Sequence, residues 1–528
     1  MASDTIHTAV DTSRAMIQAA TPLADWLVVG PVLTPLLAGA LLLMLRKRLA
    51  PQPWIACAAL AANIAMLVAL LLRILADGPL TMMMGRWMAP FGIAFTADLA
   101  GVTFALASAA VALACCIYSV ADIDGPRRRQ GFYTFFLLMM AGINGAFLTG
   151  DIFNLYVWFE VLLIASFGLI VLGSEPVQLD GSLKYAFLNL VGTTLFLIAT
   201  GYLYGTFGTL NMADLTMKLQ TAPEGAPIMT IAALFATAFA MKAAAFPLNF
   251  WLPASYHTPR IVVSALFAGL LTKVGVYALL RVLVMIMAAQ REALVDALAI
   301  VAIFTMILGV LGALAQSDIR RVLGFLVVSG IGSMIAGVAL SGEVALSGAI
   351  FYAVHSMIVM AALYLAAGVI GRRAGSFELK DLGGQYAASP WFAFGFLVLA
   401  VSVAGLPPLS GFWPKLLIVR GALSQGQGWM AAAVLVTALL TSLAVFRVWL
   451  FVFWRGGPEG TRDGAEAWVL KPLSPASARL SGLSLGALLL LTVAIGVLPQ
   501  MLVETAQQAS RGLIDPASYI ASVFGGAR

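Results

Sequence analysis

The sequence predicts an all-α polytopic membrane protein. Of its 528 residues, 61% are hydrophobic and only 10% are charged, whereas soluble domains carry about 25% charged residues. Long apolar runs with few charges recur from about residue 25 to about residue 501, and such runs are typical of helices that cross a bilayer. The short alternating segments of a membrane β-barrel do not occur, so helices are the expected spanning elements.

Fourteen membrane spans are expected from a criterion of about 20 residues for each helix. They lie near residues 25–44, 54–76, 97–120, 131–149, 151–173, 183–207, 226–258, 261–287, 294–316, 320–341, 344–371, 390–424, 429–454 and 479–501. The seventh and twelfth contain prolines and are expected to be broken, because proline removes a backbone donor and clashes with the preceding turn. The tail after Leu498 is weakly amphipathic, and we expect it to lie on the membrane surface.

Lysine and arginine are concentrated in alternate loops between the spans. The richer loops contain Arg46, Lys47, Arg48, Arg127, Arg128, Arg129, Lys184, Arg260, Arg320, Arg321, Arg372, Arg373, Lys380, Arg455, Arg462, Lys471 and Arg479. By the positive-inside rule these loops face the cytoplasm. We therefore expect a multi-pass protein of the cell (plasma) membrane with both termini outside. The net charge of +6 then reflects topology rather than nucleic-acid binding.

The stretch Ala238–Pro259 (AFAMKAAAFPLNFWLPASYHTP) departs most from an ordinary membrane span. It is apolar, yet it carries Lys242, Pro247 and Pro253. A lysine ammonium near the bilayer centre costs about 2.5–3.5 kcal/mol on insertion scales. A plain lipid-facing helix gains nothing from such residues, so we interpret the stretch as a broken helix that lines a hydrated path for ions.

The twelfth span repeats this pattern at Leu406–Lys415 (LPPLSGFWPK), where prolines again lie close to a lysine. Paired interruptions of this kind indicate an inverted repeat around a central ion site. We expect two five-helix inverted repeats, helices four to eight and nine to thirteen. The predicted units are residues 1–130 (the first three helices), 131–287 (the first repeat), 288–454 (the second repeat) and 455–528 (helix fourteen and the C-terminal tail).

Five ionisable residues within the predicted spans form the candidate site: Glu160, Lys242, Lys273, His355 and Lys415. Burial away from water favours the neutral forms of acids and amines, so such groups can exchange protons near physiological pH. An acid and a lysine close together titrate as a coupled pair. A row of these groups can therefore act as a proton relay across the membrane.

Each group also has a structural interpretation. Glu160 and Lys242 could form a structural ion pair, Lys273 could extend its ammonium toward the interface, and Lys415 could be a helix-end lysine. His355 could be an ordinary buried histidine. We prefer a functional role because ionisable residues inside a membrane are rare and commonly mark transport paths.

Other polar residues near the spans are interpreted separately. Lys184 and Arg281 lie nearer span ends, and we expect both side chains to reach the interface. Asp318 is expected to begin a helix. Tyr256 and His257, in the second half of the broken seventh helix, are candidates for a cytoplasmic entry.

The sequence contains no motif for a cofactor or a metal. Cys57, Cys115 and Cys116 lie in apolar runs without metal-type spacing, and we interpret them as buried small hydrophobic residues. The three histidines are too scattered for haem ligation or a metal cluster. Phosphate-binding loops and nucleophile elbows are also missing.

At the candidate site residues and the two broken spans, the sequence resembles the antiporter-like membrane subunits shared by respiratory complex I and the Mrp cation/proton antiporters. KAAAFPLNFWLPASYHTP resembles the family's lysine and proline-broken seventh helix. LLTKVGVYALLR and AGLPPLSGFWPKLLI resemble its eighth- and twelfth-helix signatures. VWFEVLLIASFGLIVLG, followed by LKYAFLNLVGTTLFLIATGYLYGTFGTLNMADL, is most similar to the D-type subunit of Mrp antiporters. The resemblance extends over nearly the whole chain.

The resemblance implies that Glu160 pairs with Lys242, that Lys273 and His355 continue a central polar axis, and that Lys415 ends it. It also implies that the chain works within a multi-subunit complex that exchanges cytoplasmic Na⁺ or K⁺ for external protons without redox chemistry. Many family members carry a lysine five residues after the eleventh-span histidine, where this chain has Met360. Methionine cannot carry a proton, so the step from Lys273 to Lys415 must depend on His355 and water.

Three functions are compatible with these features. The first is a subunit of a Na⁺ (or K⁺)/H⁺ antiporter with a proton relay. The second is a proton-pumping, non-redox membrane subunit of a complex I-like NADH:quinone oxidoreductase or of a membrane-bound hydrogenase, in which a partner supplies redox energy. The third is a structural scaffold subunit. The similarity in the fifth and sixth spans favours the antiporter.

Overall fold

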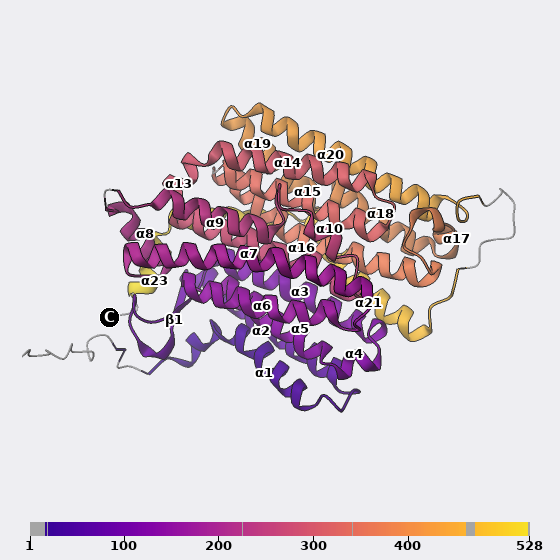
Figure 1. Ribbon diagram of the computed structural model, residues 1–528, viewed down its shortest axis with the longest axis horizontal. Helices are drawn as coiled ribbons and strands as arrows, with labels where there is room; N and C mark the ends of the chain where they lie inside the picture. Colours follow the sequence, from indigo (N-terminus) through magenta and orange to yellow (C-terminus); the bar gives the residue numbers. More distant parts are fainter. Residues whose placement is uncertain (1–15, 18–19, 224, 341, 461–469, 526–528) are drawn as a thin grey trace, which may run out of the picture.

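The computed structural model describes residues 16–17, 20–223, 225–340, 342–460 and 470–525, which form a bundle of long helices lying side by side (Figure 1). Within these residues, ten helices are long and apolar enough to cross a membrane, and four shorter apolar helices accompany them. Each predicted span contains one of these helices. The chain is a multi-pass membrane protein.

The long helices include two that contain π-helical turns. They are α2 (Gln52–Asp77), α3 (Leu99–Asp122), α6 (Ile152–Val171), α7 (Pro176–Phe207), the continuous span of α11 (Ile261–Leu266), η5 (Phe267–Leu271), α12 (Thr272–Leu279) and η6 (Leu280–Ile286), α14 (Val295–Ala315), α15 (Ile319–Leu340), α16 (Glu343–Ala374), α20 (Gly428–Trp449) with η8 (Leu450–Trp454), and α21 (Pro475–Val497). The shorter apolar helices are α1 (Gly30–Met44), α5 (Phe132–Leu148), α9 (Ile228–Ala243) and α18 (Pro390–Ala404).

Two of the shorter helices are the first halves of the broken spans. Helix α9 stops before Ala244, which has a positive φ of 61°, and the chain resumes as helix α10 (Trp251–Ser255). Helix α18 stops before Gly405, with a φ of 88°, and the chain resumes as α19 (Phe412–Ser424). The predicted breaks in the seventh and twelfth spans are therefore present. The inverted relation between the two halves stays a prediction.

Helix α16 and the span Ile261–Ile286 form the centre of the bundle. The most apolar 18-residue window of each is buried entirely inside the protein, whereas only 28% of that window is buried in α21 and 33% in α2. The outer helices expose large apolar side chains such as Leu183, Leu439 and Leu490. This gradient suits a bundle surrounded by lipid, in which the central helices meet only protein.

Short elements cover the two ends of the bundle (Figure 1). One end carries α4 (Gly125–Arg129) and α17 (Gln385–Ala388). The opposite end carries α8 (Met212–Lys218), α13 (Ala288–Ala293) and a hairpin of β1 (Leu80–Met83) and β2 (Ala94–Ala97). The two strands are antiparallel, and Thr81 pairs with Thr96. The sequence pattern did not predict this hairpin.

The C-terminal tail is helical and packs on the protein. It forms α22 (Gln500–Ile514) and α23 (Ala517–Phe524), which pack on the protein. Helix α22 lies against α16, where Ser510 donates a hydrogen bond to the Glu343 carbonyl at 3.1 Å and Arg511 pairs with the Glu343 carboxylate at 2.7 Å. Its small residues Ala506 and Ala509 are buried. One side of α22 thus packs against the bundle, and the expectation that the tail lies on the membrane surface stays a prediction.

We expect Gly332→Ala to destabilise the bundle. A Cβ at this position in α15 would lie 2.5 Å from the backbone nitrogen of Met306 in α14, and neither backbone has room to move. Overpacking of this kind costs about 1–3 kcal/mol, so the melting temperature of the detergent-solubilised protein should fall. Gly201→Ala is the matched control, because nothing lies within 4 Å of the Cβ position there. An equal effect of both substitutions would contradict the packing.

Candidate functional site

The five candidate residues lie on five different helices: α6 (Glu160), α9 (Lys242), α12 (Lys273), α16 (His355) and α19 (Lys415). Helix α9 packs against α12, the π-helical segment η5 before α12 packs against α16, and α16 packs against α19. Lys242 lies over the Phe159 ring of α6, next to Glu160 in the sequence. The fold therefore places the five residues on a series of neighbouring helices, although the first and last, Glu160 and Lys415, are 255 positions apart in the sequence (415 − 160). The four basic residues are buried, and Glu160 is half-buried.

Lys242 lies in the last turn of α9, directly before the break. Its ammonium donates a hydrogen bond to the Thr193 hydroxyl of α7 at 2.8 Å and lies 5.0 Å from the centre of the Phe159 ring. One hydroxyl and one aromatic face are a sparse environment for a buried ammonium, which has three donors. The side chain is therefore held by few contacts and has donors to spare.

Glu160 does not form the direct ion pair that the family resemblance implies. Lys242 and Glu160 interact electrostatically, but no ion pair joins them among those of the described residues, and Oε1 of Glu160 is buried without a hydrogen-bond partner. A buried unsatisfied carboxylate oxygen is costly. The structure therefore shows Lys242 on Thr193, with an acceptor left open on its acidic neighbour.

Lys273 is fully buried at the centre of the bundle. Its ammonium donates a hydrogen bond to the Ala268 carbonyl at 2.6 Å. Ala268 lies in η5, the π-helical segment Phe267–Leu271, and π-turns alter the regular backbone pairing and are frequent at functional sites. Two residues on, a Cβ at Gly275 would lie 2.8 Å from the Ala243 nitrogen. This close approach brings α12 against the end of α9 that carries Lys242.

His355 faces the break in the twelfth span. Its Nδ1 lies 2.8 Å from the Ser410 hydroxyl, which in turn lies 2.9 Å from the Ser402 hydroxyl. His355 also lies within electrostatic reach of Lys273 and Lys415. Among the five candidate residues, His355 is thus the one whose side chain lies within electrostatic reach of both Lys273 and Lys415. The hydroxyls of Ser410 and Ser402 connect it to the broken twelfth span.

Lys415 follows the break in the first turn of α19. Its ammonium donates hydrogen bonds to the carbonyls of Val403 at 3.0 Å and Ala404 at 2.7 Å. These carbonyls end α18 and have no partner within a helix that stops there. Lysine near a helix C-terminus is favoured by the helix dipole. The break therefore provides the polar backbone that a buried lysine needs.

Arg281 was wrongly expected to reach the membrane interface. It is fully buried, and its guanidinium pairs with the Asp98 carboxylate, which caps α3. The Nε atom donates a hydrogen bond to the Tyr277 hydroxyl at 2.8 Å. Sequence reasoning missed Asp98, although an acidic residue directly before an apolar run is a typical helix N-cap, and its side chain does accept from the Gly101 nitrogen at 2.9 Å.

The remaining sequence candidates lie at the edge of this site or outside it. Nδ1 of His257 lies 2.9 Å from the Pro253 carbonyl, and Nε2 lies 3.2 Å from Arg321. Met360 is buried in α16. Asp318 begins α15 as expected, because its carboxylate accepts a hydrogen bond from the Arg320 nitrogen at 2.7 Å. In the part of the chain that is described, no group of three His, Cys, Asp or Glu side chains is arranged to hold a metal ion.

The cysteines are only partly as expected. Cys115 and Cys116 are buried, but Cys57 is partly exposed. The Cys57 and Cys116 sulfurs lie 3.3 Å apart. All three are free thiols.

Comparison with known proteins identifies the family. A family model described as "NADH:quinone oxidoreductase/Mrp antiporter, TM" matches residues 149–441, more than half of the chain. The chain belongs to this family. A relative from Alkalihalophilus pseudofirmus, named as the D-type subunit of a Na(+)/H(+) antiporter, is 37% identical over 94% of this chain and 99% of its own length. The resemblance to D-type subunits is therefore confirmed.

Solved structures agree with this assignment. A chain in the structure of the Mrp complex from Dietzia sp. superimposes with a TM-score of 0.88 at 30% identity, covering 96% of this chain and 100% of its own. A chain of the archaeal membrane-bound sulfane sulfur reductase superimposes with a TM-score of 0.85 at 23% identity, covering 94% of this chain and 99% of its own. The second likeness extends only to the fold.

We expect Gly405→Ala to be more harmful than Gly426→Ala. Both glycines have positive φ, at 88° and 72°, so alanine carries a backbone cost of about 1–2 kcal/mol at each. Only at Gly405 would the Cβ also meet Lys415, 2.7 Å from Cδ and 3.0 Å from Nζ, whereas Gly426 has open space. Displacing the ammonium leaves two buried carbonyls unpaired. Melting of the two purified variants tests this, and equal losses would contradict the role of Gly405.

Proposed function

We propose that the chain is a subunit of a multi-subunit Na⁺ (or K⁺)/H⁺ antiporter and carries a transmembrane proton relay through Glu160, Lys242, Lys273, His355 and Lys415. The observation that carries the proposal is the row of five ionisable groups on five adjoining helices, two of them at helix breaks. Buried ionisable residues on neighbouring helices are expected where a membrane protein moves protons.

The first half of the relay centres on Lys242. Its ammonium contacts Thr193, while Glu160 keeps an unsatisfied carboxylate oxygen nearby. A swing of the lysine side chain from the hydroxyl to the carboxylate needs no backbone change, because the stem has four methylenes. Lys242 then passes its proton either to Glu160 or, through the contact of α9 with α12, to Lys273.

The second half depends on the break between α18 and α19. His355 interacts with Lys273 and Lys415, and its Nδ1 contacts the Ser410 hydroxyl. A histidine that gains a proton at one ring nitrogen and releases one from the other transfers charge without moving. Many family members carry a lysine at the position of Met360. In this chain, His355 therefore carries the proton between Lys273 and Lys415 in place of that lysine. Lys415 ends the relay at the carbonyls of Val403 and Ala404.

The relatives support the exchange of a monovalent cation for protons as the proposed function. The D-type Na(+)/H(+) antiporter relative matches almost the whole chain at 37% identity, whereas the likeness to the sulfane sulfur reductase is at 23%. This difference favours a secondary transporter subunit over a proton-pumping subunit of a redox enzyme. The partners are then the other subunits of an Mrp-type complex, and the energy comes from the ion gradients.

The proposed location is the cell membrane, with both termini outside. The end of the bundle that carries α4 contains Arg127, Arg128 and Arg129, and the positive-inside rule assigns such loops to the cytoplasm. The end with the β1–β2 hairpin and α23 then faces outward. The chain is then divided into four proposed units. Residues 131–287 and 288–454 are the two inverted repeats, residues 1–130 contain the first three helices, and residues 455–528 contain helix fourteen and the C-terminal tail.

We expect Glu160→Ala and Lys242→Ala to abolish cation-dependent proton movement without preventing assembly. Each removes one group of the proposed pair, and loss of a proton-transfer group lowers rates by about 100-fold or more. The measurement is exchange in everted membrane vesicles that contain the assembled complex, with Na⁺ and K⁺ compared. Subunit content is determined in the same vesicles.

Lys184→Ala is the matched control, because Lys184 is an exposed lysine that pairs with Asp180 at 2.5 Å on the surface of α7. Surface pairs of this kind contribute about 0–1 kcal/mol, so exchange should stay normal. Normal exchange in both Glu160→Ala and Lys242→Ala would exclude the relay and favour the scaffold function.

A further inference from the structure

A buried ion pair lies on the outward side of Lys273 and is not part of the relay described above. The Arg281 guanidinium pairs with the Asp98 carboxylate, and the two side chains are only 1% and 9% exposed. Asp98 also accepts a hydrogen bond from the Gly101 nitrogen. A buried charge pair is a poor source of stability, because desolvation offsets most of the attraction. A buried ion pair inside a membrane protein is therefore better explained by a function than by stability.

The pair is connected inward along one helix face. Lys273, Tyr277 and Arg281 follow one another at intervals of four residues in the same continuous span, so they lie on one side of it, about 6 Å apart along its axis. The Tyr277 hydroxyl accepts from Arg281 at 2.8 Å and donates to the Phe147 carbonyl at 2.6 Å. Tyr277 therefore lies between Lys273 and Arg281 along this face of the helix, and its hydroxyl contacts the ion pair.

A series of hydroxyl groups lies on the outward side of the pair. Arg281 lies 5.3 Å from the centre of the Tyr519 ring of α23. The Tyr519 hydroxyl lies against the Thr96 hydroxyl of β2, Thr96 lies 3.1 Å from the Thr81 hydroxyl of β1, and Thr81 lies 2.9 Å from the Ser522 hydroxyl. Hydroxyls both donate and accept, so each can receive a proton from one neighbour and pass one to the next.

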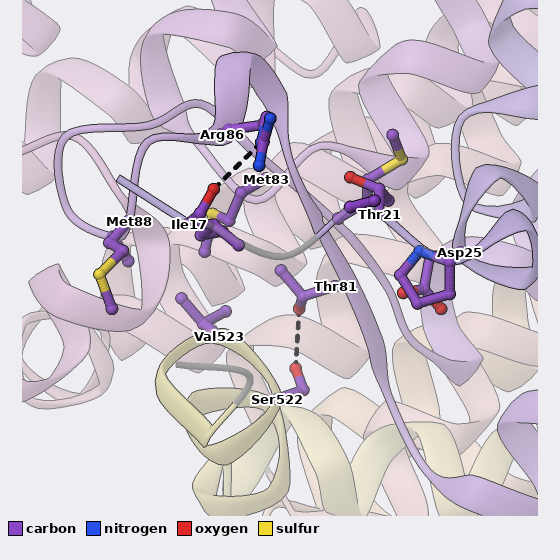
Figure 2. Close-up of a pocket in the computed structure, with 13 residues that line it drawn as sticks. Ile17, Thr21, Asp25, Thr81, Met83, Arg86, Met88, Ser522 and Val523 are labelled. Carbon is purple, nitrogen blue, oxygen red and sulfur yellow. Dashed lines mark hydrogen bonds between the residues drawn. The ribbon is translucent and has the colours of Figure 1, made fainter. Parts of the chain in front are cut away.

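The hydroxyl series ends in a cavity at the outward end of the bundle. Thr81 and Ser522 line a cavity of about 290 Å³ between the β1–β2 hairpin, α23 and the segment around Ile17. Figure 2 shows these two residues joined by a hydrogen bond, with Met83 and Val523 also lining the cavity. The hairpin and α23 lie at the end of the bundle opposite α4 (Figure 1). The cavity therefore opens on the side that the proposed orientation assigns to the exterior.

We propose that this series is an outward-opening proton path to Lys273, with the Asp98–Arg281 pair as its gate. The proposal rests on the proposed function, because it takes Lys273 as part of the relay. A proton from external water passes along the hydroxyls of Thr81, Thr96 and Tyr519 to the Asp98 carboxylate. The neutral carboxyl releases Arg281 and then gives its proton, through the Tyr277 hydroxyl, to the neutral amine of Lys273, which becomes an ammonium.

Arg281 keeps its own proton throughout and has a separate task. Its fixed positive charge opposes the entry of Na⁺ or K⁺ along the same path, as basic residues do in other selective pores. When Lys273 has taken the proton, the Asp98 carboxylate is again ionised and pairs with Arg281. The gate therefore closes behind each proton, and the hydroxyl series is disconnected from the relay until the next one arrives.

The first test is a charge-neutral double variant. Asp98→Asn leaves Arg281 unpaired, so both assembly and exchange should fall. Asp98→Asn combined with Arg281→Gln removes both charges and should restore assembly. If Asp98 carries protons, exchange in everted vesicles should stay about 100-fold below that of the unaltered complex. Recovery of exchange together with assembly would overturn the proposal and leave the pair with a structural role.

The second test removes single oxygen atoms. Tyr519→Phe and Thr96→Val preserve shape and should each slow exchange by about 100-fold while subunit content stays unchanged. The matched controls are Tyr133→Phe, whose hydroxyl accepts from Ser119, and Thr200→Val, whose hydroxyl bonds its own helix at Phe196. Full activity of Tyr519→Phe and Thr96→Val would exclude the hydroxyl path and would leave the relay of Glu160, Lys242 and Lys273 standing.

The third test measures the access of external water to the path by cysteine labelling, which does not require transport activity. In the assembled complex with Cys57, Cys115 and Cys116 replaced by alanine, Thr81→Cys, at a position that lines the cavity, should react with a membrane-impermeant methanethiosulfonate added outside intact cells. Ser518→Cys, exposed on α23, should react as a control, and Ser108→Cys, buried in α3, should not. Failure of Thr81→Cys to react while Ser518→Cys does would overturn the path, even in a complex without exchange.

Discussion

The need to hold an ammonium away from water determines the architecture around the candidate site. A regular helix offers few free backbone acceptors to a side chain from elsewhere, because each interior carbonyl already accepts an intrahelical bond. The protein supplies acceptors by departing from regular helix where lysines lie. Lys415 uses two carbonyls at the end of α18, and Lys273 uses the Ala268 carbonyl of a π-turn. The broken and π-helical segments are thus the structural condition for burying these charges.

The three lysines differ in how firmly they are held. Lys415 donates to two carbonyls, Lys273 to one, and Lys242 to a single hydroxyl. A side chain with fewer fixed partners needs less free energy to move, since each hydrogen bond to a charged group contributes about 1.5–3 kcal/mol. Lys242, beside an open oxygen of Glu160, is therefore the lysine best suited to switch between partners, and Lys415 is best suited to define an end point.

The spans, both helix breaks and the burial of Lys242, Lys273, His355 and Lys415 within the bundle could be predicted from the sequence, because apolar length, proline and membrane-embedded charge are local signals. The hydrogen-bond partners of these residues could not be predicted. Thr193 and Ser410 are ordinary polar residues in the sequence, and only tertiary packing brings them to Lys242 and His355. The same holds for Arg281, whose place near a span end suggested the interface, while Asp98 lies 183 positions away at the start of α3. The hairpin was missed because its strands have only four residues each.

The contrast between Arg281 and the lysines has a physical basis. The guanidinium is satisfied from several sides, by the Asp98 carboxylate, the Tyr277 hydroxyl and the ring faces of Tyr277 and Tyr519. Arginine stays charged in proteins and presents donors in a fixed plane, whereas a buried lysine can lose its charge. A side chain that must change protonation suits the centre of the bundle, and one that must keep its charge suits a barrier. In this chain the lysines are buried within the bundle, and Arg281 lies toward the end of its span that meets α23, where Tyr519 covers it.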